Sequence, residues 1–227
     1  MALRDIAIVG TAQRPSEVNS TFTSVEILLP VIQQLLDKVG IERSDIGFWC
    51  HGSCDYMSGQ PFSFVSAVDA IGAWPPIVES HVEADGALAL YEAWVKIQTG
   101  EVDVALVFSN GKTTSGPIDQ ILSLQTDPYM VAPLKPGFDA LAALQARACL
   151  DAGVVTERQM AEVASRSRRD ANNNAIAFTK GNESVEELLA MPYTMNPLRA
   201  HDCATPVDGC NAVVLAAGDI ARRLATR

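Results

Sequence analysis

Three ionisable side chains fall within five residues near the middle of the chain: His81, Glu83 and Asp85. In an extended backbone every second side chain points the same way, so the three groups are expected to share one side. Histidine accepts and returns protons near neutral pH, and neighbouring carboxylates can orient it or act as bases. This window is the first candidate for acid–base catalysis. The alternative is that His81 is only hydrogen-bonded at a strand end or at a partner contact.

Asp85 also has a purely structural interpretation. It precedes an apolar pattern of helical period that ends at Gly100, and aspartate is among the best residues for capping a helix N-terminus. A carboxylate in that position has its ionised form stabilised, which makes it a weaker base. The cap and the general base remain two alternatives for Asp85.

Cysteines offer a second possible chemistry. The chain has five of them at irregular spacing, which indicates reduced thiols. The segment Cys50–Cys54 superficially resembles a metal-binding fragment, but structural zinc needs four ligands, and no second Cys/His pair with suitable spacing follows. We therefore expect no metal, and we predict a small-residue turn at residues 51–53.

The elements that must position these residues alternate regularly over residues 4–108. Short apolar runs at 6–9, 46–50, 77–78 and 104–108 are typical of buried strands, and segments of helical period separate them. The first of these helical segments opens with the capping-box spacing Thr23–Glu26 and stops at Gly40. Such crossovers predict a mainly parallel sheet with helices on both faces. Next comes a long loop at 109–136 rich in Gly, Pro, Ser and Thr, followed by helices near 137–152 and 156–171 and a short helix that starts at Ser184 and is limited by Pro192. A turn at Asp208-Gly209 then precedes a fifth strand at 211–216, and a final helix is capped by Asp219.

Composition excludes several classes of function. The 227 residues are 48% hydrophobic and carry a net charge of −10 without a basic stripe, so nucleic-acid binding is not expected. No apolar run reaches the roughly 18 residues that span a bilayer, and no signal peptide is present, so we expect a cytoplasmic protein. The dinucleotide-binding fingerprint, the P-loop and the serine nucleophile elbow are missing from the sequence.

Several segments together resemble a known family. They are Arg4–Gly10, Thr99–Val107, Asn196–Leu198 and Asp208–Leu215, the last with Cys210 where alanine is usual. They resemble thiolases of the sterol-carrier-protein-x type. Residues 46–83 are most similar to actinobacterial "lipid-transfer protein" homologues linked to steroid side-chain breakdown. The resemblance covers about half of such a protein, so the second half is expected in a longer product or on another chain.

The resemblance implies a thiolase-like N-terminal half of class α/β, with a five-stranded mixed sheet, mostly parallel, helices on both faces and a loop-domain insertion. It divides the chain into 1–110, an insertion at 111–192, and a final strand and helix at 193–227. In this family the nucleophilic cysteine stands at a helix N-terminus, where a thiol is activated. Asp85 or Gly86 stands there in this chain. Acyl-enzyme chemistry from this half is therefore not expected.

The resemblance also implies where coenzyme A would bind. Family members cover it with the inserted loop domain, which in this chain carries Arg166, Arg168, Arg169 and Lys180. Arg166, Arg169 and Lys180 are the candidates to meet its phosphates, whereas the simpler interpretation of these residues is a solvated helix face. Coenzyme A would arrive as part of the substrate, and no permanently bound cofactor is expected.

The expected activity is retro-aldol cleavage of a steroid side-chain β-hydroxyacyl-CoA by an aldolase-like subunit. It would act in a dimer with another thiolase-fold chain and with a small zinc-ribbon/OB-fold protein. One alternative is a catalytically silent subunit of a heteromeric complex. A second is a thiolase of the acetyl-CoA acetyltransferase type. Lipid transfer receives little weight, because in this family it belongs to a separate sterol-carrier domain.

Overall fold

The computed structural model describes residues 3–59, 61–114 and 116–224. The chain forms two compact units, one made of residues 1–115 and 207–227 and the other of residues 116–206. Within the described residues no helix is long and apolar enough to cross a membrane. The compact units divide at 116 and 207, where the sequence-based division has 111 and 193.

The first unit contains a five-stranded sheet with the order β1-β7-β4-β2-β3. Its strands are β1 (Ile6–Gln13), β2 (Phe48–Ser53), β3 (Val78–Glu83), β4 (Val104–Gly111) and β7 (Gly209–Ala217). β2 pairs in parallel with β3 and β4, whereas β7 is antiparallel to both β1 and β4. β7 alone therefore runs against the other four strands of this sheet. The expected mixed, mostly parallel sheet is confirmed.

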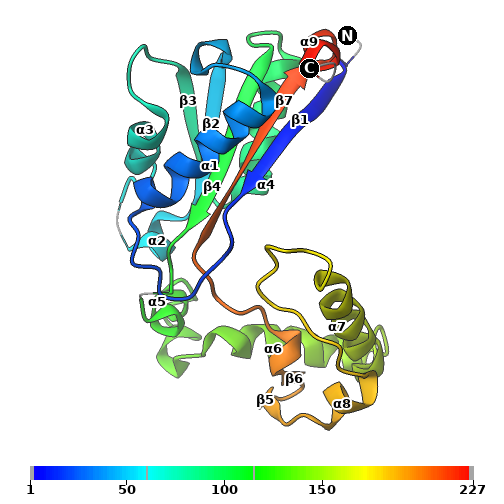
Figure 1. Cartoon of the computed structure of the whole chain (residues 1–227). Coiled ribbons are helices and arrows are strands. Elements are labelled where there is room, and N and C mark those ends of the chain that lie inside the picture. The colour runs from blue at the N-terminus through cyan, green and yellow to red at the C-terminus, as the bar shows by residue number, and fades with distance from the viewer. Residues whose placement is uncertain (1–2, 60, 115, 225–227) are drawn as a thin grey trace. The chain divides into compact units, whose positions relative to one another are not determined.

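Helices cover both faces of this sheet (Figure 1). The helical elements of the unit are α1 (Ser24–Val39), η1 (Arg43–Asp45), α2 (Asp55–Ser58), α3 (Val65–Ile71), α4 (Gly86–Gln98) and α9 (Gly218–Leu224). α1 and α3 pack on one face around Trp49, Leu106 and Phe108. α4 packs on the other face around Phe48 and Cys50. Neighbouring residues of one strand thus belong to opposite cores, as strand alternation requires.

Local signals place several of these helices correctly. Thr23 and Glu26 form the predicted capping box of α1, and Gly40 ends that helix in the left-handed conformation. α1 continues through Pro30 with its apolar stripe buried. Asp219 lies in the first turn of α9 and does not precede the helix as its cap.

The predicted turn at residues 51–53 is wrong, because these residues form the end of β2. β2 has a hydrogen-bonded neighbour on each side, and all six of its residues are buried. The polar His51 is tolerated there because its Nε2 lies 2.7 Å from Asn110 Oδ1 on β4. Sheet pairing on both sides therefore outweighs the small, polar character of the segment.

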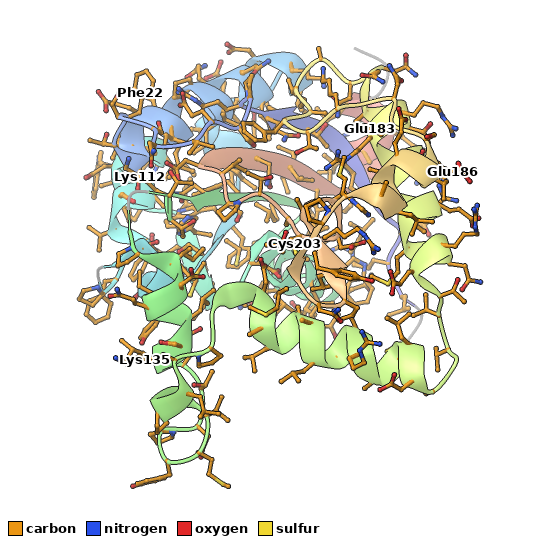
Figure 2. All side chains as sticks on the ribbon, turned by 90° about the horizontal axis from the view of Figure 1, so that it is seen from below. Phe22, Lys112, Lys135, Glu183, Glu186 and Cys203 are labelled. Atoms are coloured by element: carbon orange, nitrogen blue, oxygen red, sulfur yellow. The ribbon has the colours of Figure 1, made fainter. Side chains whose placement is uncertain are left out.

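The predicted turn at Asp208-Gly209 is also wrong. Asp208 is 1% exposed, and its backbone forms a bridge with Glu17. Its carboxylate accepts hydrogen bonds from Ser20 N, Thr114 N and Thr114 Oγ1 at 2.7 to 3.0 Å. Lys112 Nζ donates to Ser20 O, and Figure 2 shows Lys112 beside the segment that carries Phe22. Asp208 therefore joins three segments of the first unit.

The second unit is mainly helical. It contains α5 (Ile118–Leu124), η2 (Ala132–Leu134), α6 (Phe138–Asp151), α7 (Glu157–Ala171), α8 (Val185–Ala190), the hairpin β5 (Tyr193–Met195) and β6 (Leu198–Arg199), and η3 (Ala200–Asp202). Arg199 holds the hairpin to α7 by an ion pair of 2.7 Å with Glu157, and Arg199 also stacks over the Tyr193 ring. Sequence reasoning missed this hairpin, because its strands have only three and two residues.

The stretch predicted as one long loop at 109–136 is more ordered than expected. β4 continues to Gly111, and α5 forms directly after Pro117. Proline fixes a backbone angle that suits a helix start, and apolar residues then recur with helical spacing at Ile118, Ile121 and Leu122. The helix was not predicted because the high Gly and Pro content of the whole stretch is typical of a loop.

One close approach fixes how α4 sits on the sheet. A Cβ added at Gly52 of β2 would lie 2.4 Å from the carbonyl oxygen of Asp85 and 2.8 Å from the nitrogen of Gly86. A Cβ at Gly86 would lie 2.9 Å from Cβ of Ser109 on β4. The start of α4 therefore rests directly on β2 and β4, and only glycine permits this contact.

We expect Gly52→Ala to lower the free energy of unfolding of the first unit by about 3 kcal/mol or more, because backbone atoms must move to admit the methyl group. Urea unfolding followed by tryptophan fluorescence measures this, since Trp49, Trp74 and Trp94 all belong to that unit. Gly111→Ala on β4 is the matched control, because nothing lies within 4 Å of its added Cβ. Equal effects of the two substitutions would contradict the proposed contact.

Candidate functional site

The junction between β3 and α4 is the position where the sequence places the candidate site. Asp85 precedes α4, and its Oδ1 accepts hydrogen bonds from Ala87 N at 2.9 Å and Leu88 N at 3.0 Å. This geometry confirms the predicted N-cap. The carboxylate thus satisfies amide groups that would otherwise face outward at the positive end of the helix dipole.

The surroundings of the junction leave little space at Gly86. Its position faces Ser109 of β4 and Asn211 Oδ1 of β7, which lies 3.7 Å from the ideal Cβ. A cysteine at residue 86 would have to displace Ser109. A cysteine at residue 85 would instead take the place of the capping carboxylate. Both positions that align with the family's nucleophile are therefore committed to packing or to capping.

The existing cysteines do not compensate for this. Burial raises the pKa of Cys50 to about 12, with the charge of Glu92 adding to the effect, and burial raises the pKa of Cys210 to about 12. Burial also raises the pKa of Cys203 to about 11. A thiol with such a pKa is almost entirely protonated near pH 7 and is a poor nucleophile. Cys54 lies before the short α2, and Cys149 is exposed on α6.

His81 and Glu83 lie on the other side of the sheet from α4. In the parallel register of β2 and β3, His81 is the partner of His51. The Trp49 face of β2 belongs to the α1 and α3 core, so alternation places His51 and His81 on that face too. Phe64, just before α3, stacks on the His81 ring with a centroid distance of 5.4 Å.

The three residues of the predicted window therefore do not form one set. Asp85 caps the helix on one face of the sheet, whereas His81 Nε2 and Glu83 Oε2 lie 3.9 Å apart on the other face. The expectation of a shared side holds only for His81 and Glu83. It fails for Asp85 because β3 ends at Glu83, and the chain turns into α4 before the alternation reaches residue 85.

Sequence reasoning missed the partners of His81, which come from residues 53 to 63. Ser53 Oγ lies 3.0 Å from His81 Nε2 and 2.8 Å from Ser63 Oγ. Ser63 Oγ donates to Asp55 Oδ1 at 2.6 Å, and both oxygens of Glu83 accept from Asp55 N. These contacts form between the end of one strand and a loop beyond it, so no periodic pattern in the sequence announces them.

His51 is a further histidine that the sequence analysis treated only as part of a turn. Its side chain is fully buried between Phe108 and His81, with ring centroids 5.3 and 5.6 Å away. Burial lowers the pKa of His51 to about 4, opposed in part by the hydrogen bond to Asn110. His51 is therefore neutral near pH 7, and its Nδ1 has no partner among the described residues.

Ligand atoms of Asp55, His81 and Glu83 lie within 4.8 Å of one another, which is a spacing that a metal ion can use. Every one of these side chains already has a hydrogen-bond partner within the protein. The sequence-based expectation of no metal considered only cysteine and histidine spacing, and it stays a prediction.

The basic residues expected at coenzyme A are all on the second unit. Arg166 and Arg169 are exposed on α7, and Lys180 is exposed in the segment that follows it. Arg166 lines a hollow of about 770 Å³ together with Met160, Val163 and His201. Arg169 pairs with Asp170, and Arg168 pairs with Glu183. No hydrogen bond or ion pair joins Arg166, Arg169 and Lys180 in the described part of the chain.

Known proteins resemble this chain in sequence and in fold. No family model matches it. An acetyl-CoA acetyltransferase of Methanothermobacter thermautotrophicus is 25% identical over 228 aligned positions, covering 97% of this chain and 59% of that protein. The benzoylsuccinyl-CoA thiolase subunit BbsB of Thauera aromatica is 32% identical over 69 residues, which are 30% of this chain and 18% of that subunit.

Two solved structures share the fold. One is an Ltp2-ChsH2(DUF35) aldolase, with a TM-score of 0.76 and 20% identity over 96% of this chain and 56% of that one. The other is the acetyl-CoA acetyltransferase of Bacillus anthracis, with a TM-score of 0.74 and 16% identity over 98% of this chain and 68% of that one. The chain therefore has the N-terminal half of the thiolase-superfamily fold. It spans 59% of the Methanothermobacter acetyltransferase and 56% of the matched aldolase chain.

We expect that Asp85→Cys creates a thiol whose pKa lies at about 7.5 or below, because the amides that Asp85 now occupies would stabilise the thiolate. The rate of iodoacetamide alkylation at residue 85, measured against pH by peptide mass spectrometry, checks this. The exposed Cys149 on α6 provides the reference in the same sample. Identical pH dependence at both positions would show that the junction does not activate a thiol.

We expect acidification from pH 6.5 to 4.5 to lower the free energy of unfolding of the first unit by about 2 kcal/mol through His51. The pKa of folded His51 is depressed, so the unfolded state binds the proton first, and stability is lost as pH falls from about 6.5 toward 4. Hydrogen bonds from Ser63 lower the pKa of Asp55 below its ordinary 3.8, so that carboxyl titrates below this window.

Urea unfolding at the two pH values, followed by tryptophan fluorescence, measures the loss. His51→Leu is the comparison, because it removes the titrating ring and should make the pH dependence shallower. If His51→Leu shows the full loss, another group is responsible.

Proposed function

We propose that this chain is the N-terminal half of a thiolase-fold subunit that acts on CoA thioesters without an acyl-enzyme intermediate. The observation that supports this most directly is the Asp85 carboxylate on the amides at the start of α4. The helix end that would stabilise a thiolate already holds an anion, and the adjoining Gly86 has no room for a larger side chain. Thiolysis by the acetyl-CoA acetyltransferase route is therefore the less favoured reading, although a relative bears that name.

The reaction that fits best is retro-aldol cleavage of a β-hydroxyacyl-CoA, with a steroid side chain as the proposed acyl group. A base removes the hydroxyl proton, the bond between the α and β carbons breaks, and the β carbon becomes a carbonyl. The electron pair passes to the α carbon as a thioester enolate, which is then protonated. No covalent intermediate with a thiol is needed, which agrees with the α4 junction. The resemblance to an Ltp2-ChsH2(DUF35) aldolase supports the proposal at the level of fold.

We propose two kinds of partner for this activity. One is a thiolase-fold chain, identical or different, placed against the edge strand β3 and the outer side of α4. β3 pairs with β2 alone, and Val78, Leu88 and Tyr91 are each more than half exposed there. The other is a small zinc-ribbon/OB-fold protein of the DUF35 kind. Arg166, Arg169 and Lys180 are proposed to meet the phosphates of the substrate's coenzyme A, in the cytoplasm.

A catalytically silent subunit is the second candidate. The same capping contact favours it, because an Asp85 carboxylate that is fully used by the helix leaves the junction without a reacting group of its own. Such a chain would supply an interface and part of a substrate passage to an active partner.

We expect the full gene product with its DUF35 partner to release a carbonyl compound from a β-hydroxyacyl-CoA and to be insensitive to iodoacetamide. The same preparation should not cleave a β-ketoacyl-CoA in the presence of CoA. Coupled carbonyl detection and chromatography of the CoA esters measure both reactions. Thiolysis by this chain alone would sink the proposal. Turnover that depends wholly on a second thiolase-fold chain, and survives Asp85→Ala unchanged, would favour the silent subunit.

A further inference from the structure

The polar groups on the α3 face of the sheet form one chain of hydrogen bonds that begins at Asp55. Asp55 Oδ2 accepts from Phe62 N at 2.6 Å, and Oδ1 accepts from Ser63 N at 2.9 Å and from Ser63 Oγ at 2.6 Å. These hydrogen bonds, that from Ser63 Oγ first, lower the pKa of Asp55, so it is an ionised acceptor near pH 7. An ionised carboxylate has no proton to donate, so the Ser63 hydroxyl proton points to Asp55.

The direction of the next two links follows from counting protons. Each serine hydroxyl has one proton, and that of Ser63 is already used. The contact of 2.8 Å between Ser53 Oγ and Ser63 Oγ must therefore be donated by Ser53. The contact of 3.0 Å between Ser53 Oγ and His81 Nε2 must in turn be donated by His81. The neutral His81 ring consequently carries its proton on Nε2.

The other ring nitrogen is left open. In the described part of the chain, the hydrogen bond and the ion-pair contact of His81 both involve Nε2, and Nδ1 has no hydrogen bond. The buried atoms without a partner include Nδ1 of His51 and of His201 but not that of His81. Since 16% of the His81 side chain is exposed, Nδ1 is accessible from solvent. Phe64 stacks on the ring and fixes its plane.

We propose that His81 is a proton-accepting site, in which Asp55, Ser63 and Ser53 hold the ring as the Nε2–H tautomer and Nδ1 accepts the proton of a ligand hydroxyl. In that step the O–H bond of the ligand breaks, the proton joins Nδ1, and the electron pair stays on the ligand oxygen. The imidazolium that forms still donates through Ser53 and Ser63 toward the Asp55 carboxylate. Glu83, 3.9 Å from Nε2, adds a second negative charge, whereas His51 is neutral.

This site is distinct from the junction at α4, because it lies on the opposite face of the sheet. It also differs from a metal site made of the same residues. We call the hydrogen-bonded series Asp55–Ser63–Ser53–His81 the relay. In the relay, a proton on Nε2 lies between the His81 ring and the carboxylates of Asp55 and Glu83, where a cation would have to bind. The relay and a bound cation therefore exclude each other.

Long-range ¹H–¹⁵N NMR of the labelled full chain tests the tautomer. The chain has three histidines, so His51→Gln and His201→Gln assign the signals. We expect a pyrrole-type Nε2 and a pyridine-type Nδ1 for His81. Ser63→Ala frees the Ser53 proton to donate to Nε2, so the ring should switch toward the Nδ1–H tautomer. Ser66→Ala is the matched control, because that hydroxyl donates to Ser63 O outside the relay.

Three results would overturn the inference. The first is an Nδ1–H tautomer in the unaltered chain. The second is a His81 tautomer that responds neither to Ser63→Ala nor to Ser53→Ala, two variants that break the relay at different links. The third is loss of the Nε2 proton on adding one equivalent of Zn²⁺, which would make the cluster a metal site.

The ligand is probed with 3-hydroxybutyryl-CoA against butyryl-CoA, which lacks the hydroxyl. We expect the His81 Nδ1 signal to shift with 3-hydroxybutyryl-CoA and not with butyryl-CoA. Equal shifts with both compounds would contradict the proposal that Nδ1 binds a ligand hydroxyl. The choice of a thioester rests on the proposed function, whereas the tautomer does not. A correct tautomer without any C–C cleavage would therefore count against the function and not against the relay.

Discussion

The contact between Gly52 and the Asp85–Gly86 peptide is the constraint on which the first unit depends. It brings the backbone of a central strand against the first residues of α4, closer than any side chain allows. That contact fixes the end of the helix, and the end of the helix fixes the Asp85 cap. The same strand continues to Ser53, which begins the polar chain on the opposite face. One short stretch of β2 thus positions two separate groups of polar residues.

The sheet divides these groups because alternate residues of a strand face opposite layers. Cys50 and Gly52 face α4, whereas His51 and Ser53 face α3. On the α4 face, the start of the helix packs closely against Gly52 and Ser109, and the Asp85 carboxylate caps the helix end. The α3 face holds the rings of His51 and His81 and the hydroxyls of Ser53 and Ser63.

Much of the fold was predictable because its signals are local. A capping box, a buried apolar stripe and a terminal glycine fall within one helix, so α1 was placed almost to the residue. The thiolase-like half was recognisable from motifs at strand ends. β2 was cut short because His51–Ser53 look like a turn until two neighbouring strands are known. The partners of His81 lie 18 to 28 residues away in a segment without a periodic pattern. The sequence could therefore indicate His81 as a site residue, but it could not predict which residues contact it.

The two carboxylates show why position decides what such a group does. Asp85 accepts hydrogen bonds from backbone amides, and an amide N–H cannot accept a hydrogen bond in return. The Asp85 carboxylate therefore stabilises the helix end and passes no hydrogen bond on to a further group. Asp55 faces a hydroxyl, and a hydroxyl that gives its proton to one side must accept from the other. In the proposed relay, Asp55 thereby orients two serine hydroxyls, and these hydroxyls hold the proton of His81 on Nε2. Of these two carboxylates, Asp85 therefore has a structural role at the helix end, whereas Asp55 is the one that the proposed proton-accepting site at His81 requires.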